Sequence, residues 1–254
     1  MALLEIRSVT KRFGGVTALN SMDLTLGERE IVGVIGPNGA GKTSFFNCIT
    51  GLTPVDEGAV YFDDGKICLN KLSPNKILEA GVARTFQNLR IFKNMTLLEN
   101  VAVGFHSRTQ TGLWDVFLQT PRQRREEREV MEESARLLDF IGLKGFENET
   151  ASNLPYGHQK RLEIARALAT RPRVLLLDEP VAGMNASEKE EITALIRKIR
   201  QRDIAILIIE HDMKVIMPLS DRVVVMDEGT KIAEGLPEAI RVHPRVIQAY
   251  LGEG

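Results

Sequence analysis

Residues 36–43 read Gly-Pro-Asn-Gly-Ala-Gly-Lys-Thr, a spacing of glycines, lysine and hydroxyl that suits phosphate binding. Glycine has no side chain to block the backbone from wrapping a phosphate, and the N–H groups of such a loop point inward at the start of a helix. The lysine would reach the β- and γ-phosphates, and the threonine hydroxyl would bind Mg²⁺. The candidate nucleotide-binding residues are therefore Gly36, Pro37, Asn38, Gly39, Ala40, Gly41, Lys42, Thr43 and Ser44.

Two carboxylates, Asp178 and Glu179, follow the apolar run Val174–Leu177. Ligands of open α/β sheets bind at the carboxyl ends of parallel strands, so these carboxylates can meet the phosphate-binding loop. We expect Asp178 to be a Mg²⁺ partner and Glu179 to be the base that orients and polarises the attacking water. An acidic pair after a strand is often only part of a turn. The presence of the phosphate-binding loop in the same chain favours a catalytic role for this pair.

Guanine specificity finds no support in the sequence. GTPases carry an Asn-Lys-x-Asp motif, but Asn70-Lys71 continues with Leu-Ser and Asn75-Lys76 continues with Ile-Leu.

Short runs of aliphatic and β-branched residues predict the strands that position these groups. The runs are Leu3–Val9, Ile31–Ile35, Val60–Phe62, Val174–Leu177, Ile204–Ile209 and Arg222–Met226. Three of them are continuously apolar, which favours parallel strands covered by helices on both faces. The turn Asp227-Glu228-Gly229 predicts a hairpin at an edge.

The middle of the chain, residues 89–160, is predicted to be helical. Thr96 with Glu99 forms a capping-box pattern, and Thr120-Pro121 with Gln123 forms another.

The composition excludes several classes of protein. The formal net charge is −1, so no nucleic-acid partner is expected. Cys48 and Cys68 follow no metal-ligand spacing and are too sparse for a disulfide scaffold, which indicates a reducing compartment. No apolar stretch approaches the length of a membrane span, and the amino terminus lacks a signal-peptide pattern, so work at a membrane would be peripheral.

The order of these motifs resembles the ATP-binding-cassette (ABC) ATPases over essentially the whole chain. Phe13 occupies the place of the family's adenine-stacking aromatic. Gln87, within Arg84-Thr85-Phe86-Gln87, resembles the Q-loop glutamine that contacts Mg²⁺ and water. His211 resembles the switch histidine near the γ-phosphate. The resemblance implies ATP and Mg²⁺ as ligands, Glu179, His211 and Gln87 as catalytic residues, and Thr43, Gln87 and Asp178 at the metal.

The resemblance also implies an α/β fold: a P-loop NTPase (RecA-like) core with an antiparallel β subdomain and an inserted α-helical subdomain. The single ABC ATPase domain would span 1–254, with 1–88 and 161–254 as the nucleotide-binding core and 89–160 as the helical signature subdomain.

The family's signature, usually Leu-Ser-Gly-Gly-Gln, corresponds here to Leu154-Pro155-Tyr156-Gly157-His158. In the family this segment opens a helix whose amino terminus faces the γ-phosphate held by the other subunit. Pro155 supplies neither hydroxyl nor N–H, whereas Gly157 permits close backbone approach. We therefore expect binding across a dimer through main-chain groups. Ala182-Gly183-Met184-Asn185 resembles the D-loop, with Asn185 where aspartate is common.

Within the family the chain resembles the LivG type, the ATPase of high-affinity importers of branched-chain amino acids. The segments that carry this likeness are Arg84–Phe92, Met95–Asn100, the tyrosine-containing signature and Ala249–Glu253. The type implies a homodimer or a heterodimer with a second ABC ATPase, transmembrane permease subunits, indirectly a solute-binding protein, and a peripheral place on the cytoplasmic side of the inner membrane.

Other functions remain alternatives. The lipopolysaccharide-export ATPase has a similar architecture, and a soluble ABC ATPase is the more distant choice, although no long coiled-coil insertion or second cassette is visible. A non-catalytic nucleotide-binding regulator would be expected to lack the base, yet Glu179 is present.

Overall fold

The apolar runs of the sequence form the centre of a sheet in the computed structural model, which describes residues 2–106 and 121–251. Within those residues the sheet has six strands, in the order β10 (Thr230–Gly235), β9 (Arg222–Asp227), β3 (Ile31–Ile35), β8 (Ala205–Ile209), β7 (Val174–Asp178) and β6 (Val82–Arg84). Neighbouring strands are parallel except β9 and β10. Every residue of β3, β7 and β8 is buried, which confirms the predicted parallel strands covered on both faces.

The hairpin predicted at Asp227-Glu228-Gly229 is confirmed, because β10 pairs antiparallel with β9 and is the last strand on that side of the described sheet. Glu228 and Gly229 have φ angles of 43° and 76°. A tight hairpin turn requires this left-handed backbone.

A second, antiparallel sheet contains two strands that the sequence analysis did not identify, β2 (Val16–Gly27) and the two-residue β5 (Ile67–Cys68). Its order among the described residues is β2, β1 (Ala2–Phe13), β4 (Glu57–Phe62) and β5. β2 buries Leu19, Met22, Leu24 and Leu26 and leaves most of its other residues exposed. A strand that is apolar on one face only does not produce the continuous run by which the other strands were found.

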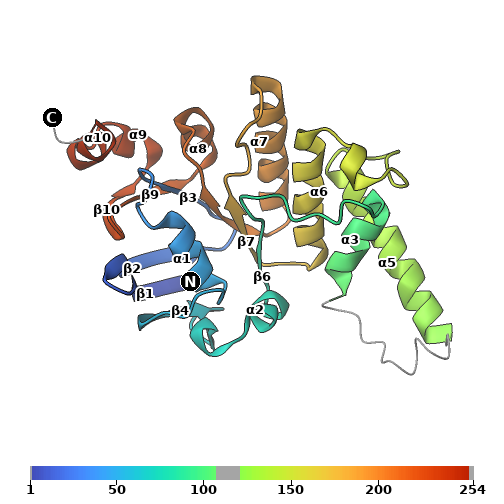
Figure 1. Cartoon of the computed structure of the whole chain (residues 1–254), viewed down its shortest axis with the longest axis horizontal. Helices are drawn as coiled ribbons and strands as arrows, with labels where there is room; N and C mark the ends of the chain where they lie inside the picture. The colour runs from blue at the N-terminus through green and yellow to red at the C-terminus, as the bar shows by residue number, and fades with distance from the viewer. Residues whose placement is uncertain (1, 107–120, 252–254) are drawn as a thin grey trace. The chain divides into compact units, whose positions relative to one another are not determined.

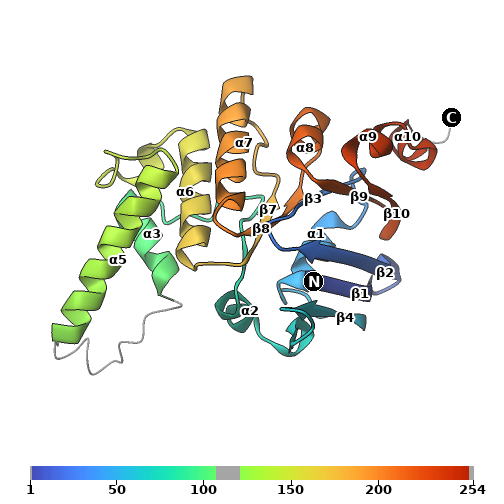
Figure 2. The ribbon, with the colours of Figure 1, turned by 180° about the vertical axis from the view of Figure 1, so that it is seen from behind.

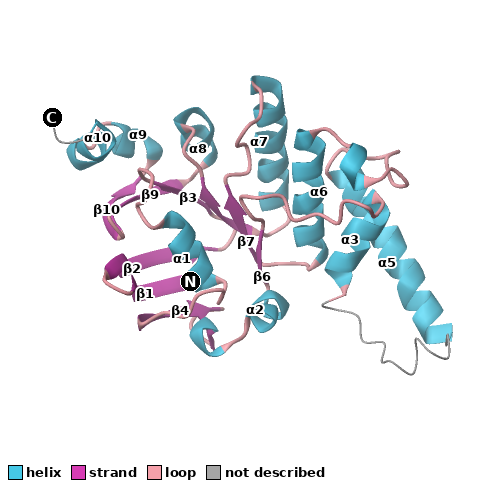
Figure 3. Ribbon diagram, in the orientation of Figure 1, coloured by secondary structure: helices cyan, strands magenta, loops and turns pink. Residues whose placement is uncertain are grey.

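Helix α1 (Lys42–Ile49) lies between the two sheets (Figures 1 and 3). Phe45, Phe46 and Ile49 are fully buried in a core that includes residues of both sheets. The helix that follows the phosphate-binding loop is therefore held from both sides.

The other helices of this part of the chain are α2 (Pro74–Ala80), α7 (Ala186–Arg200), α8 (Met213–Leu219), α9 (Pro237–Arg241) and α10 (Pro244–Leu251). α7 and α8 cover the face of the six-stranded sheet opposite to α1 (Figure 2). None of the described helices combines the length and the apolar composition that crossing a bilayer requires.

The chain divides into two compact units, one formed by Met1–Arg84 with Arg173–Gly254 and the other by Thr85–Pro172. The helical unit thus begins earlier and ends later than the predicted segment 89–160. The later end has a simple cause: α6 (Tyr156–Ala169) is one continuous helix, and a boundary at 160 would cut it.

The described part of the helical unit contains α3 (Leu97–Phe105), α5 (Pro121–Phe140) and α6, and its described segments 85–96 and 141–150 are not helical, so the predicted helix does not run throughout. The capping box is confirmed: the Thr96 side chain accepts from the Glu99 N–H, and the Glu99 carboxylate accepts from the Thr96 N–H. The second capping pattern begins at Thr120, outside the described residues. At Gly104 a Cβ would lie 2.4 Å from the carbonyl oxygen of Arg166, so α3 and α6 pack closely only because this residue is glycine.

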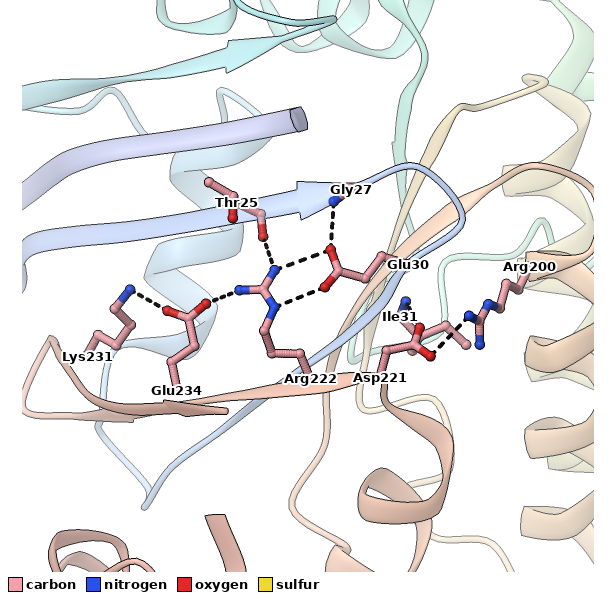
Figure 4. A network of polar contacts seen from close by, with 9 residues as sticks. All are labelled: Thr25, Gly27, Glu30, Ile31, Arg200, Asp221, Arg222, Lys231 and Glu234. Atoms are coloured by element: carbon pink, nitrogen blue, oxygen red, sulfur yellow. Dashed lines mark hydrogen bonds and ion pairs between the residues drawn. The ribbon is translucent and has the colours of Figure 1, made fainter. Parts of the chain in front are cut away.

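Arg222 joins the two sheets at the amino ends of β3 and β9 (Figure 4). Its guanidinium donates to both carboxylate oxygens of Glu30, at 3.0 and 3.2 Å, to the carbonyl of Thr25 at 2.6 Å, and to Glu234. Glu30 also accepts from the Gly27 N–H at 2.7 Å. This charged cluster lies at the opposite end of β3 from the phosphate-binding loop, so we assign it to holding the sheets together.

We predict that Arg222→Lys lowers the free energy of unfolding by about 2 kcal/mol, because an ammonium cannot reach all the acceptors that the planar guanidinium reaches. Urea denaturation measures the change. The matched control is Arg12→Lys, at an exposed ion pair with Glu57 in the same unit, which should change the free energy by less than about 0.5 kcal/mol. Equal changes in the two variants would contradict the role of the Arg222 cluster.

Candidate nucleotide-binding site

The predicted phosphate-binding loop connects the carboxyl end of β3 to the start of α1. Gly36 is buried, whereas Asn38, Gly39 and Thr43 are exposed. The loop therefore presents its tip and the first turn of α1 to solvent, where a ligand can reach them.

The Lys42 side chain folds back over this loop. Its Nζ donates to the carbonyl oxygens of Gly36 at 2.7 Å and Pro37 at 2.8 Å. Burial lowers the pKa of Lys42, and the carboxylates of Glu179 and Asp178 oppose this shift. The ammonium thus lies in the field of the acidic pair, as the sequence predicted for one shared site.

Two glycines of the loop are required by close contacts with backbone. A Cβ at Gly36 would lie 2.1 Å from the carbonyl oxygen of Met226, and one at Gly41 would lie 2.4 Å from that of Ala18. Gly39 differs, because a Cβ there would meet no atom within 4 Å although its φ is +85°. The loop is tight against β2 and β9 and open on the side where a phosphate would bind.

Asp178 is almost fully buried at the end of β7 and pairs with Arg84 at the end of β6. Arg84 Nη2 donates to Asp178 Oδ2 at 2.7 Å, and Nη1 donates to Asn47 Oδ1 of α1, also at 2.7 Å. The guanidinium also lies over the Phe46 ring, 5.3 Å from its centroid. Arg84 therefore fixes Asp178 relative to the helix that carries the loop lysine.

Glu179 has a φ of +47°, an uncommon backbone conformation for a residue other than glycine. Its N–H donates to the carbonyl oxygen of Ile209 at 2.9 Å. Glu179 Oε1 lies 3.7 Å from His211 Nδ1, so the two side chains face each other without a direct hydrogen bond. This brings together two of the three predicted catalytic residues.

Glu210, next to His211, organises the loops around this pair. Its fully buried carboxylate accepts from the N–H groups of His211 at 2.9 Å and Asp212 at 3.2 Å, and it is also hydrogen-bonded by the N–H of Val181. Burial raises the pKa of Glu210, and these hydrogen bonds oppose the shift. One carboxylate thus links the segment after Glu179 to the segment that carries His211.

The donor set fits Mg²⁺. Thr43 offers a hydroxyl and Asp178 a carboxylate, both hard oxygen ligands. The described residues contain no group of three or more His, Cys, Asp or Glu that could hold a metal ion by themselves. Mg²⁺ commonly uses one or two carboxylates and completes its coordination with substrate phosphates and water.

Two aromatic residues, one in β1 and one in α10, belong to the same unit as the loop. Phe13 ends β1 with 49% of its surface exposed, so its ring face is accessible for the predicted stacking on adenine. Lys11 Nζ lies 5.2 Å from the centroid of this ring. The hydroxyl of Tyr250 in α10 accepts from the backbone N–H of Gly36, and burial raises the pKa of Tyr250 to about 12.

The remaining predicted site residues lie in the helical unit. The side chain of Gln87 is exposed, and Gly157 is buried in the first turn of α6. Pro155 is the N-cap of this helix and makes no side-chain cap hydrogen bond, as expected for a residue without a hydroxyl.

Asn185 is the N-cap of α7, where its side-chain oxygen accepts from the Glu188 N–H at 3.0 Å. The asparagine in the D-loop position therefore caps a helix of its own chain.

Sequence reasoning gave no role to Arg84, Glu210 or Tyr250. For the first two a signal exists: each is a charged residue at the carboxyl end of a short apolar strand, the edge at which the other site residues were sought. No comparable signal marks Tyr250, because its contact with Gly36 depends on how α10 folds back.

Two sequence families match the chain. The family described as "ABC transporter" matches residues 19–182, and the family described as "Branched-chain amino acid ATP-binding cassette transporter" matches residues 230–254. The second match includes residues 252–254, which lie outside the residues that the structure describes.

Curated relatives match over nearly their whole length. The high-affinity branched-chain amino acid transport ATP-binding proteins BraF of Pseudomonas aeruginosa and LivG of Escherichia coli are each 47% identical over 252 residues, covering 99% of this chain and 98% of theirs. A probable LivG of Methanocaldococcus jannaschii is 33% identical over 257 residues, 100% of this chain and 98% of that one.

Solved structures agree. An ATP-binding cassette of an ABC transporter in its ADP conformation superimposes with a TM-score of 0.86 at 32% identity, covering 100% of both chains. A dimeric post-hydrolysis cassette bound to ADP and phosphate gives 0.77 at 26% identity, covering 92% of this chain and 98% of that one. The fold, the spaced motifs and the full-length likeness lead to one conclusion: the chain belongs to the ABC transporter family and is an ATP-binding cassette of that family, an ATPase.

Proposed function

We propose that this chain is the ATP-hydrolysing subunit of an importer of branched-chain (hydrophobic) amino acids, with residues 1–254 forming one ABC ATPase domain. The observation that carries the ATPase role is the meeting of Lys42, Asp178, Glu179 and His211 at one edge of the parallel sheet. The full-length likeness to BraF and LivG supports the choice of solute.

In this proposal the loop amides and Lys42 bind the phosphates of ATP. Thr43 and Asp178 would hold Mg²⁺, which would supply positive charge at the transferred phosphoryl group. Arg84 keeps Asp178 in place through the 2.7 Å ion pair. Phe13 would stack on the base, and a metal and water contact for Gln87 rests on the family resemblance alone.

Glu179 accepts the proton of the attacking water, and His211 lies beside it to contact the γ-phosphate. The carboxylate is only partly buried, with 21% of its side chain exposed, so water can reach it. The Glu179 N–H donates to the Ile209 carbonyl oxygen and the His211 N–H donates to the Glu210 carboxylate, and these hydrogen bonds fix the two residues relative to each other.

We further propose that two cassettes, identical or homologous, close on ATP between the loop of one and the α6 amino terminus of the other, with Gly157 allowing close approach. Transmembrane permease subunits and, indirectly, a solute-binding protein would complete the assembly, in which the cassettes have a peripheral place on the cytoplasmic side of the inner membrane. The dimeric cassette that superimposes on this chain supports the pairing. Lipopolysaccharide export and a soluble ABC role remain alternatives.

We predict that Glu179→Gln preserves ATP binding but lowers the hydrolysis rate about 100-fold or more, because the amide cannot accept the water proton. The same variant should accumulate as an ATP-bound dimer in size-exclusion chromatography. Phosphate release and fluorescent-ATP binding measure the two properties. Normal turnover in this variant would remove Glu179 from the role of base.

Gly41→Ala should weaken ATP binding at least tenfold, because the new Cβ would lie 2.4 Å from the carbonyl oxygen of Ala18 and would displace the loop. The control is Gly65→Ala, at a φ of +81° but with no atom within 4 Å of the new Cβ. The Gly65→Ala variant should lose about 1 kcal/mol of folding stability, because alanine disfavours the left-handed backbone conformation. It should bind ATP normally. Calorimetric titration with ATP and Mg²⁺ compares them, and equal affinities would show that the contact does not matter.

The solute is tested with the intact complex of cassette, permease and binding protein in membranes. Leucine, isoleucine or valine should stimulate ATP hydrolysis several-fold, whereas glutamate and lysine should not. Stimulation by lipopolysaccharide instead, with no response to any amino acid, would favour the alternative. Glu179→Gln in the same complex is the background control.

A further inference from the structure

Helix α6 contains a buried pair of opposite charges, Lys160 and Glu163, one turn apart. The two residues expose only 1% and 2% of their surface, and Lys160 Nζ lies 3.3 Å from Glu163 Oε2. Charged side chains are rarely buried this completely unless they have partners. A buried ion pair is also weak evidence for stability, since apolar residues of similar size often stabilise as well or better.

Both charges hold the backbone of residues 86–90, which we call the glutamine segment because Gln87 lies in it. Lys160 Nζ donates to the carbonyl oxygens of Phe86 at 2.9 Å and Gln87 at 3.3 Å. Glu163 Oε1 accepts from the N–H groups of Phe86 and Arg90, both at 3.3 Å. The pair therefore forms hydrogen bonds with the backbone before and after Gln87, while Gln87 itself is exposed.

The next turn of α6 continues this contact. The Arg166 guanidinium donates to the carbonyl of Arg90 and lies over the ring of Phe92, 5.3 Å from its centroid. Lys160, Glu163 and Arg166 are three residues apart and so share one face of the helix. This face binds an irregular segment whose backbone groups have no strand or helix ladder to satisfy them.

We propose that Lys160 and Glu163 are positioning residues that fix the backbone around Gln87 to α6, so that the glutamine segment and the signature helix move as one body. The proposal rests on the proposed function, in which Gln87 responds to the permease and the amino terminus of α6 meets ATP on a second cassette. A movement imposed on Gln87 then reaches Gly157 through two buried side chains rather than through a flexible loop.

The test uses the full chain with three substitutions. Lys160→Met removes both carbonyl contacts, and Lys160→Met with Glu163→Leu also removes the carboxylate that accepts from the Phe86 and Arg90 amides, so that no charge is left buried. Because the double variant buries no net charge, it should fold as well as wild type and separates positioning from stability. The matched control is Lys144→Met, which removes an exposed pair with Asp139 in the same unit.

Hydrogen exchange gives the direct readout. In the wild-type chain the amides of Phe86 and Arg90 should be protected although they lie outside helices and strands. In the double variant, which lacks the acceptor at position 163, their exchange should accelerate at least tenfold, with no change in Lys144→Met. Unprotected wild-type amides, or unchanged exchange in the folded double variant, would overturn the proposal.

The functional readout is the ratio of permease-stimulated to basal ATP hydrolysis in the intact complex. The double variant should bind ATP like wild type, since the loop is untouched, and should lose most of the stimulation. Wild-type stimulation in this variant would overturn the proposal, and so would a loss of ATP binding equal to the loss of stimulation. Absence of ATP hydrolysis by wild type itself would instead refute the proposed function.

Discussion

The candidate site depends on one packing constraint: the backbone of the phosphate-binding loop lies directly against the backbone of neighbouring strands. At Gly36 the neighbour is the last part of β9, and at Gly41 it is β2 of the antiparallel sheet. Any side chain at either position would push the loop away from the sheets and α1 with it. The antiparallel sheet is therefore part of the support of the loop, which explains why both sheets share a core with α1.

The second organising feature is the common edge at which the parallel strands end. β3 leads into the loop, β6 ends at Arg84, β7 ends at Asp178, and β8 is followed by Glu210 and His211. Their register brings an arginine, an aspartate and a histidine from distant parts of the sequence to the same edge. The cluster around Arg222 lies at the amino-terminal ends of β3 and β9. The charges that hold the sheets together are therefore separated from those near the candidate ligand site.

The central strands, the edge hairpin and the Thr96 cap were predictable because each leaves a local pattern in the sequence: an apolar run, a turn or a capping pair. β2 was not, since its burial on one face alternates with exposed residues, and β6 is only three residues long. The phosphate-binding loop was predicted from its residue types and spacing, and the acidic pair from its place after an apolar run. Contacts between distant segments, such as Arg84 with Asp178 or Tyr250 with Gly36, depend on the tertiary fold and leave no such pattern.

The hydrogen bonds from Lys42 to the carbonyl oxygens of Gly36 and Pro37 have a further consequence. A free lysine side chain carries about 2 kcal/mol of rotamer entropy, most of which is lost when its ammonium is fixed. Here that loss has already occurred within the folded chain. The cation is preorganised over the loop, so association with a polyphosphate requires an exchange of acceptors rather than the ordering of a mobile side chain.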